Sequence, residues 1–205
     1  MDAHRRRPSA LRERTRRAVQ KEIAAAANAL FAAHGYEATT VDDIAAAAGM
    51  SQRSVFRYFP TKEDIVLGKV GFAADEMLAA LRDRPAGEPV WDAFRHVFGL
   101  LVREADEPER RAIVEMHRII FETPALLAGY LQKLQHVQDA ALAALTERAA
   151  AEHTPYAPDD PTPRALVAAA FGCLVAAQQA WHAGGAKGSF ADALDRAMAA
   201  VRPAG

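Results

Sequence analysis

The sequence predicts an all-α protein of about nine helices, and three observations lead to this fold class. Alanine is abundant while Val, Ile, Thr and aromatic residues are sparse, a composition that favours helix over sheet. Apolar residues recur at steps of three and four along the first long segment, as on one face of a helix. No segment alternates apolar and polar residues convincingly, as a half-buried strand would. The 205 residues suffice for one or two domains with a real core.

Four helices are expected in the N-terminal part, and each later one begins at a Ser or Thr that can cap it. Thr40 and Asp43 have the spacing of a capping box, Ser51 is the next plausible N-cap, and Thr61 with Asp64 repeats the capping pattern. Gly and Pro residues end the first three of these helices. The expected ranges are 11–34, 41–48, 51–59 and 61–82.

Loops rich in Pro, Gly and acidic residues separate five further helices in the remaining sequence. Their expected ranges are 89–104, 108–122, 124–152, 163–183 and 189–201. This is more helix than a small binding head requires, so the C-terminal part is expected to hold a second function.

The second and third expected helices are joined by a tight turn around Gly49, which makes the pair a helix-turn-helix. Glycine supplies the positive φ of such a turn without steric cost, and Ile44 and Val55 would hold the two helices together. The second helix of this motif lies in the DNA major groove, where donors and acceptors meet phosphates and base edges. Its outward face carries Ser51, Gln52, Arg53, Ser54 and Arg57.

Charge is distributed unevenly along the chain. Residues 1–62 carry 11 Lys and Arg against 6 Asp and Glu, whereas residues 63–205 carry 14 against 20. A basic N-terminal part on an acidic remainder indicates a head that faces nucleic acid. Arg5, Arg6 and Arg7 precede the first helix, and two interpretations of them stay open: an arm in the minor groove or a solvated tail.

The stretch "AAAANALFAAHGYEATTVDDIAAAAGMSQRSVFRYFPTKEDIV" resembles the DNA-binding head of TetR-family transcriptional regulators. The resemblance implies a DNA-binding domain with a basic arm over 1–60 and an effector-binding and dimerisation domain over 61–205. It implies a cytoplasmic homodimer, joined through the last two helices, that represses transcription at a palindromic double-stranded operator. A small hydrophobic effector would release it.

The resemblance also implies roles for single residues. Thr40 and Lys62 would contact phosphates, while Arg53 would pair with guanine and Gln52 with adenine. Phe56 stands where the family usually has tyrosine, so a hydroxyl contact is lost there. The expected DNA contacts are Thr40, Ser51, Gln52, Arg53, Ser54, Phe56, Arg57, Tyr58 and Lys62.

A second resemblance concerns the effector. The passage "RIIFETPALLAGYLQKLQHVQDAALAALTER" and a late "QQAW" are similar to the ligand domain of a TetR subgroup associated with acyl-CoA-like effectors. Such an effector has a fatty or aromatic part and an anionic end that Arg118 could meet. An ion pair is the alternative for Arg118, and core packing is the alternative for each aromatic residue. The candidate ligand contacts are Trp91, Phe94, Phe98, His117, Arg118, Phe121, Tyr130, Gln178 and Trp181.

Other classes of protein have less support. A single cysteine, Cys173, excludes an internal disulfide and a cysteine-based zinc site. No G-x-S-x-G motif and no Glu-x-x-His pair occurs, so we expect no catalytic residues, no metal and no cofactor. Neither a secretory signal nor a run of 18 apolar residues is found, and no membrane is expected. The alternatives are a helical-bundle enzyme and a helical interaction protein that does not bind DNA.

Overall fold

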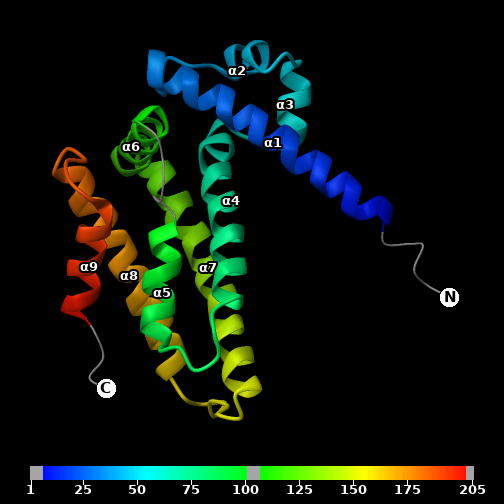
Figure 1. The fold of residues 1–205 in the computed structure, drawn as a ribbon. Coiled ribbons are helices and arrows are strands. Elements are labelled where there is room, and N and C mark those ends of the chain that lie inside the picture. The colour runs from blue at the N-terminus through cyan, green and yellow to red at the C-terminus, as the bar shows by residue number, and fades with distance from the viewer. Residues whose placement is uncertain (1–6, 101–106, 202–205) are drawn as a thin grey trace. The chain divides into compact units, whose positions relative to one another are not determined.

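The computed structural model describes residues 7–100 and 107–201, and these residues form nine helices (Figure 1). The helices are α1 (Arg7–His34), α2 (Val41–Ala47), α3 (Gln52–Tyr58), α4 (Lys62–Arg82), α5 (Val90–Gly99), α6 (Glu107–Glu122), α7 (Pro124–Ala151), α8 (Thr162–Ala183) and α9 (Phe190–Ala200). The prediction of an all-α fold is confirmed.

Two predicted helix boundaries differ from the structure by more than one residue. The first helix starts at Arg7 rather than near residue 11, because Arg7 and Ala10 are good helix formers and Pro8 is tolerated in a first turn. The helix expected over 89–104 ends at Gly99, and positions 101–104 lie outside the described residues. Arg5 and Arg6 also lie outside them, and Arg7 is the first helical residue.

The chain divides into two compact units, which we call the N-terminal unit (residues 1–70) and the C-terminal unit (residues 71–205). The N-terminal unit contains α1, α2, α3 and the beginning of α4. The C-terminal unit contains the remainder of α4 and the helices α5 to α9. The division therefore falls inside a continuous helix rather than in a loop.

The core of the N-terminal unit forms where α1 packs on α2 and α3. Its members are apolar side chains with less than a tenth of their surface exposed: Ile23, Ala24, Ala27, Phe31, Tyr36, Ile44, Ala45, Val55, Phe59, Ile65, Val66 and Leu67. Every helix of the unit contributes to this set, so the helix-turn-helix shares one core with α1 and with the start of α4.

A close contact joins α4 to the segment that follows α3. A Cβ atom at Gly68 would lie only 2.7 Å from Cε1 of Phe59, a side chain that is 4% exposed. Only glycine leaves room for the phenyl ring at this distance. At Gly71, three residues further along α4, a Cβ would meet no described atom within 4 Å.

The C-terminal unit is built around α8, which packs on α5, α6, α7 and α9. Phe94, Phe98 and Phe171 form an aromatic cluster between α5 and α8, with ring centroids 5.2 to 6.1 Å apart. By length and composition alone α8 would also pass as a membrane span. Its burial against four neighbouring helices accounts for its apolar character, because a core helix has the same composition.

The seam between α8 and α9 contains the single cysteine of the chain. Cys173 is 3% exposed, and its Sγ donates to the Ala197 carbonyl at 3.4 Å. Burial raises the pKa of the Cys173 thiol. Trp181 closes the end of α8, where its Nε1 donates to the Gly188 carbonyl at 3.2 Å and its ring packs edge-on to Phe190.

A matched pair of substitutions in α4 tests the contact at Gly68. Gly68→Ala should lower the free energy of unfolding by about 1–3 kcal/mol, because the new methyl group overpacks against Phe59. Gly71→Ala should raise it by about 0.5–1 kcal/mol, because alanine favours the helix and meets no obstacle. Thermal unfolding followed by circular dichroism compares the two variants. A Gly68→Ala protein at least as stable as the wild type would contradict the contact.

Candidate functional site

The turn between α2 and α3 is closed by two backbone hydrogen bonds. The Met50 amide donates to the Ala45 carbonyl at 2.8 Å, and the Gly49 amide donates to the Ala46 carbonyl at 3.1 Å. Gly49 has a φ of +65°, a conformation that glycine adopts without steric cost. Together the two bonds form a Schellman motif. Gly49 therefore ends α2 and sets the direction in which the chain enters α3, as the sequence predicted.

A capping box starts α2, which is also as the sequence predicted. The Thr40 hydroxyl accepts from the Asp43 amide at 3.2 Å and donates to the Asp43 carboxylate at 2.6 Å. The Thr40 amide donates to the same carboxylate at 2.9 Å, which completes the box. These bonds from Thr40 hold the pKa of the Asp43 carboxyl below its usual value. The Thr40 hydroxyl proton is thus directed at Asp43, and a phosphate oxygen would compete with that bond.

The cap of α3 uses two serines. Ser51 Oγ accepts from the Ser54 amide at 3.2 Å and lies 3.0 Å from Ser54 Oγ. Because capping occupies both hydroxyls, Ser51 and Ser54 first of all stabilise the start of a seven-residue helix. A helix this short depends on such caps and on tertiary packing, since isolated helices of its length are not stable.

The remaining residues of α3 divide between core and solvent. Val55 is fully buried, whereas Gln52, Arg53 and Arg57 are exposed. Phe56 is 41% exposed, which is unusual for a large apolar side chain in the described part of the chain. The structure therefore brings an amide, two guanidinium groups and an apolar ring together on one short helix.

The end of α3 is attached to α1. Gln20 Nε2 donates to the Tyr58 carbonyl at 3.4 Å, and the Arg57 guanidinium carbon lies 5.2 Å from the centroid of the Tyr58 ring. Tyr58 is half-buried between these groups. The sequence did not predict the bond from Gln20. Gln20 and Tyr58 are 38 residues apart, and no local pattern indicates which side chain of α1 reaches the end of α3.

Lys62 lies at the start of α4 and is bound to the turn that precedes α2. Its Nζ donates to the Tyr36 carbonyl at 3.0 Å and to the Thr39 carbonyl at 3.2 Å, and it lies 4.1 Å from the centroid of the Tyr36 ring. The Tyr36 hydroxyl donates in turn to Glu63 at 2.9 Å. Burial and this carboxylate raise the pKa of Tyr36. We call these four residues the α4 clasp.

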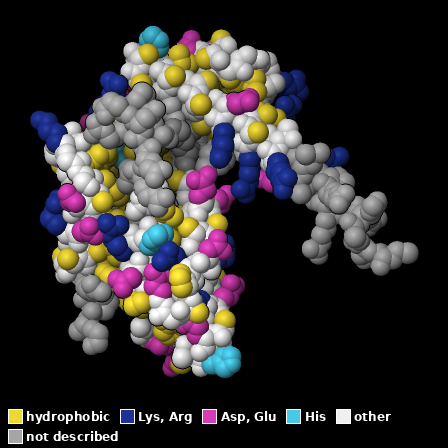
Figure 2. Space-filling view, viewed as in Figure 1, with side chains coloured by type: hydrophobic (Ala, Val, Ile, Leu, Met, Phe, Trp, Pro, Cys, Tyr) yellow, Lys and Arg dark blue, Asp and Glu magenta, His cyan; other side chains and the backbone are white. Residues whose placement is uncertain are grey.

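The surface of the N-terminal unit is rich in positive charge. Lys and Arg side chains lie along its helices in the space-filling view (Figure 2). The exposed ones are Arg12, Arg14, Arg16, Arg17, Lys21, Arg53 and Arg57. A basic surface beside a capped, exposed helix is the electrostatic footprint of a protein that binds nucleic acid.

Several ligand candidates of the C-terminal unit serve as core or as ion pairs. Trp91, Phe94, Phe98 and Trp181 are all less than a tenth exposed and pack inside the helix bundle. The Arg118 guanidinium pairs with Glu115 at 2.5 Å and with Glu122 at 2.6 Å, and these two carboxylates raise its pKa. The ion pair left open as the alternative for Arg118 is therefore the arrangement that the structure has.

The other candidates meet His182 in a group of five side chains, of which His117, Tyr130 and Gln178 are buried. We call this group the His117 cluster: His117, Phe121, Tyr130, Gln178 and His182. The Tyr130 hydroxyl donates to Gln178 Oε1 at 2.6 Å, and Phe121 lies between three rings with centroid distances of 5.9 to 6.3 Å. His117 is 9% exposed, and its Nδ1 has no hydrogen-bond partner among the described residues. A buried polar atom without a partner costs about 1–3 kcal/mol. Sequence reasoning missed His182, which is 65 positions away in the chain.

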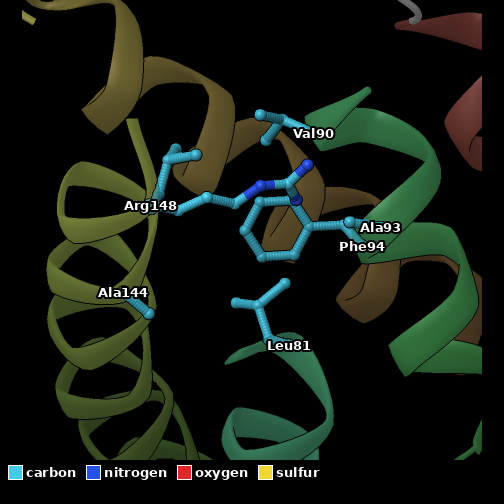
Figure 3. A pocket seen from close by; sticks show the side chains of 7 residues that line it. Leu81, Val90, Ala93, Phe94, Ala144 and Arg148 are labelled. Atoms are coloured by element: carbon cyan, nitrogen blue, oxygen red, sulfur yellow. The ribbon is translucent and has the colours of Figure 1, made fainter. Parts of the chain in front are cut away.

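A small crevice of about 250 Å³, counted with the solvent at its mouth, opens between α4, α5 and α7. Phe94 and Arg148 point toward one another across it (Figure 3). Arg148 donates to the carbonyls of Pro85 and Glu88 and pairs with Glu152 at 2.9 Å. The arginine therefore fastens the loop between α4 and α5, and the crevice is the gap beside this attachment. Among residues 7–100 and 107–201 no group of His, Cys, Asp and Glu has the geometry of a metal site.

Two family models match the chain. The model of the bacterial regulatory proteins of the tetR family matches residues 23–68, and the model of the MftR C-terminal domain matches residues 88–204, which is more than half of the chain. The HTH-type transcriptional regulator TcmR of Streptomyces glaucescens is 34% identical over 133 residues, which cover 62% of this chain and 59% of TcmR. The chain thus spans about three fifths of the length of the curated relatives it matches.

Solved structures share the fold at lower identity. FadR of Bacillus subtilis in complex with stearoyl-CoA has a TM-score of 0.58 and 20% identity, over 87% of this chain and 95% of that one. FadR of Thermus thermophilus in complex with lauroyl-CoA has a TM-score of 0.57 and 23% identity, over 90% and 97%. At these identities the likeness concerns the arrangement of helices.

Burial makes His117 a source of pH-dependent stability. Desolvation, and secondarily the nearby His182, lower the pKa of His117 from 6.5 to about 4, so the unfolded chain binds a proton that the native chain does not. The contribution of His117 to the free energy of unfolding is fully present above the pKa of this histidine in the unfolded chain, 6.5. It should be lost as the pH falls from 6.5 toward 4. The loss between about pH 7.5 and about pH 5 should be roughly 2 kcal/mol.

Urea unfolding of the wild type and of His117→Leu at the two pH values measures this difference. The leucine variant should lose much less stability, because it has no proton to bind at this position. His136→Leu is the matched control, since His136 is exposed, and it should behave as the wild type does. Equal losses in the wild type and in His117→Leu would show that His117 does not cause the effect.

Proposed function

We propose, on the premise that this chain belongs to the TetR family of bacterial regulatory proteins, that it is a ligand-responsive transcriptional repressor. In this proposal a cytoplasmic dimer binds a near-palindromic duplex operator and blocks transcription, and a small hydrophobic effector releases it. The observation that carries the proposal is α3, a capped helix that exposes Gln52, Arg53 and Arg57 while Val55 and the Gly49 turn hold it on α2.

In the proposed complex α3 enters the major groove. Arg53 presents the bidentate donor pair that recognises guanine, and Gln52 presents the amide that recognises adenine. Phe56 has no hydroxyl, and its exposed ring suits apolar contact with a thymine methyl group. Ser51 and Ser54 remain candidates for DNA contact, although their hydroxyls already serve the helix cap.

The contacts to phosphates would surround α3. Arg57 and Tyr58 lie at its C-terminal end, and Thr40 and Lys62 lie at the starts of α2 and α4. Lys62 is bound to the Thr39 carbonyl, one residue before Thr40, so the α4 clasp brings both candidates to the same place. An ammonium group has three donors, and the two carbonyls leave capacity for a phosphate oxygen.

The homodimer is proposed to form through α8 and α9. A row of small residues on α8 is exposed at helical spacing: Ala165, Ala168, Gly172, Ala176 and Ala180. Small side chains let two helices approach closely, and the exposure of this row supports its use against a second copy. A two-fold dimer places its recognition helices roughly 34–36 Å apart, one turn of DNA.

The effector is proposed to bind in the C-terminal unit and to act through α4. Acyl-CoA molecules are bound in the two FadR structures of the same fold, which supports an acyl-CoA-like effector. Because α4 begins in the N-terminal unit and ends in the C-terminal unit, a shift of this helix would change the separation of the two heads. Release then requires the effector to bind the DNA-free conformation more tightly than the DNA-bound one.

Replacing Arg53 tests the assignment of the recognition helix. Arg53→Ala should weaken binding to an operator selected from random duplex DNA by about 1–3 kcal/mol and should relax specificity at one base position. Fluorescence anisotropy with the operator and its single-base variants measures both effects. Arg82→Ala, which removes an exposed arginine of the C-terminal unit, is the control. Wild-type affinity in Arg53→Ala would refute the assignment.

Replacing Lys62 tests the phosphate contacts. Lys62→Ala should weaken binding to all sequences alike. It should also reduce the slope of log K against log salt concentration by about one, which is the contribution of one phosphate contact. Anisotropy titrations at several salt concentrations give the slope, and Lys187→Ala, at an exposed lysine of the C-terminal unit, is the control. If the slope of Lys62→Ala equals that of the wild type, the lysine serves only the α4 clasp.

A further inference from the structure

We infer that the His117 cluster is the hydrogen-bonding subsite for the effector, and that it takes an uncharged hydroxyl group carried on an aromatic skeleton. The inference rests on the proposed function, because it names the class of ligand for the same effector-binding unit. It is carried by the buried imidazole of His117, by the charges around the cluster and by the rings that line it.

The first argument is the unpartnered nitrogen. His117 is more than nine-tenths buried, and its Nδ1 finds no hydrogen-bond partner in the described part of the chain. Buried polar atoms in native proteins nearly always have a partner, so Nδ1 is an atom for which a bound ligand group would supply the missing hydrogen bond. A neutral imidazole has one donor and one acceptor nitrogen. A hydroxyl group both donates and accepts, and it therefore satisfies Nδ1 in either tautomer.

The neighbouring residue does not supply the missing bond. The Tyr130 hydroxyl is the O–H group of the cluster, and it donates to Gln178 Oε1 at 2.6 Å. Tyr130 and Gln178 come from α7 and α8, while His117 comes from α6, so the three helices meet at this position. Tyr130 and Gln178 are thus engaged with each other, and Nδ1 of His117 is left as the atom that a ligand can recognise.

The second argument is charge. Arg118 is shared between Glu115 and Glu122, and Glu122 also lies 3.9 Å from Nε2 of His182. Two carboxylates share one guanidinium beside the cluster, so an anionic ligand group would compete with them for Arg118. A buried charge of either sign would also lose its hydration beside the neutral imidazole of His117. The group that reaches His117 is therefore uncharged.

The third argument is the lining. The ring of Phe121 lies 6.1 Å from that of His117, 5.9 Å from that of Tyr130 and 6.3 Å from that of His182, measured between centroids. The imidazole of His117 therefore lies against an aromatic group that is centred on Phe121. Aromatic surfaces favour offset and edge-on contacts with other rings, which an aromatic ligand provides. A ring that carries a hydroxyl combines this contact with the missing hydrogen bond.

A pair of probes of nearly equal shape tests the inference on the full chain. 1-Naphthol carries the hydroxyl, and 1-methylnaphthalene replaces it with a methyl group. Calorimetric titration should show 1-naphthol binding about tenfold more tightly, the difference that one hydrogen bond makes. His117→Leu should bind both probes with similar affinity, whereas the exposed-site control His136→Leu should keep the wild-type preference.

A second measurement on the wild-type protein avoids any dependence on how the variants fold. Addition of 1-naphthol should shift the ring-nitrogen NMR resonances of His117, assigned by their absence in His117→Leu, and should leave those of His136 in place. Equal affinity of the wild type for the two probes, no binding of 1-naphthol, or unmoved His117 resonances would each overturn the inference.

Operator binding, measured by anisotropy in the same preparations, separates this inference from the proposed function. A chain that binds its operator but shows no preference for 1-naphthol overturns the hydroxyl subsite alone. A chain that prefers 1-naphthol through His117 but binds no duplex DNA selectively overturns the proposed regulatory function. That result still supports the hydroxyl subsite.

Discussion

The bond of the Lys62 ammonium group to the Tyr36 and Thr39 carbonyls joins the start of α4 to the turn that precedes α2. Its two acceptors belong to the turn that precedes α2, and its donor belongs to the first turn of α4. The Tyr36 hydroxyl returns a second bond to Glu63, so two successive residues of α4 are attached to one tyrosine. The cap of α2 starts at Thr40, the next residue, and the start of α4 therefore moves together with the start of α2.

Several arginines of the C-terminal unit form ion pairs or bond to a loop, while the uncharged polar groups of Tyr130 and Gln178 lie inside. Arg95 pairs with Asp195 and so connects α5 to α9, and Arg148 fastens the loop before α5. Arg118 is occupied by two glutamates of its own helix. These pairs are partly exposed, and each contributes little to stability on its own. Arg118 in particular would have to leave one of its glutamates before it could meet an anionic ligand group.

Local signals account for the parts of the fold that were predicted correctly. The caps at Thr40 and Ser51 and the turn at Gly49 depend on residues within a few positions of each other, and sequence spacing displays such relations directly. The glutamates three residues before and four residues after Arg118 were equally visible. The α4 clasp and the pairing of Tyr130 with Gln178 join residues 26 and 48 positions apart, and only the packing of helices determines which side chains meet over such separations.

The rate at which the single thiol, Cys173, is chemically modified reports how often the seam between α8 and α9 opens. A thiolate is the species that reacts with alkylating reagents, and burial in the seam between α8 and α9 suppresses both its formation and its access. Modification therefore proceeds only through molecules in which the seam has opened, and its rate measures how often that happens. With one cysteine in the chain, the mass of a single adduct records the event without any engineered label. Ligands, DNA and a second copy of the chain can all be compared by how far each slows this one reaction.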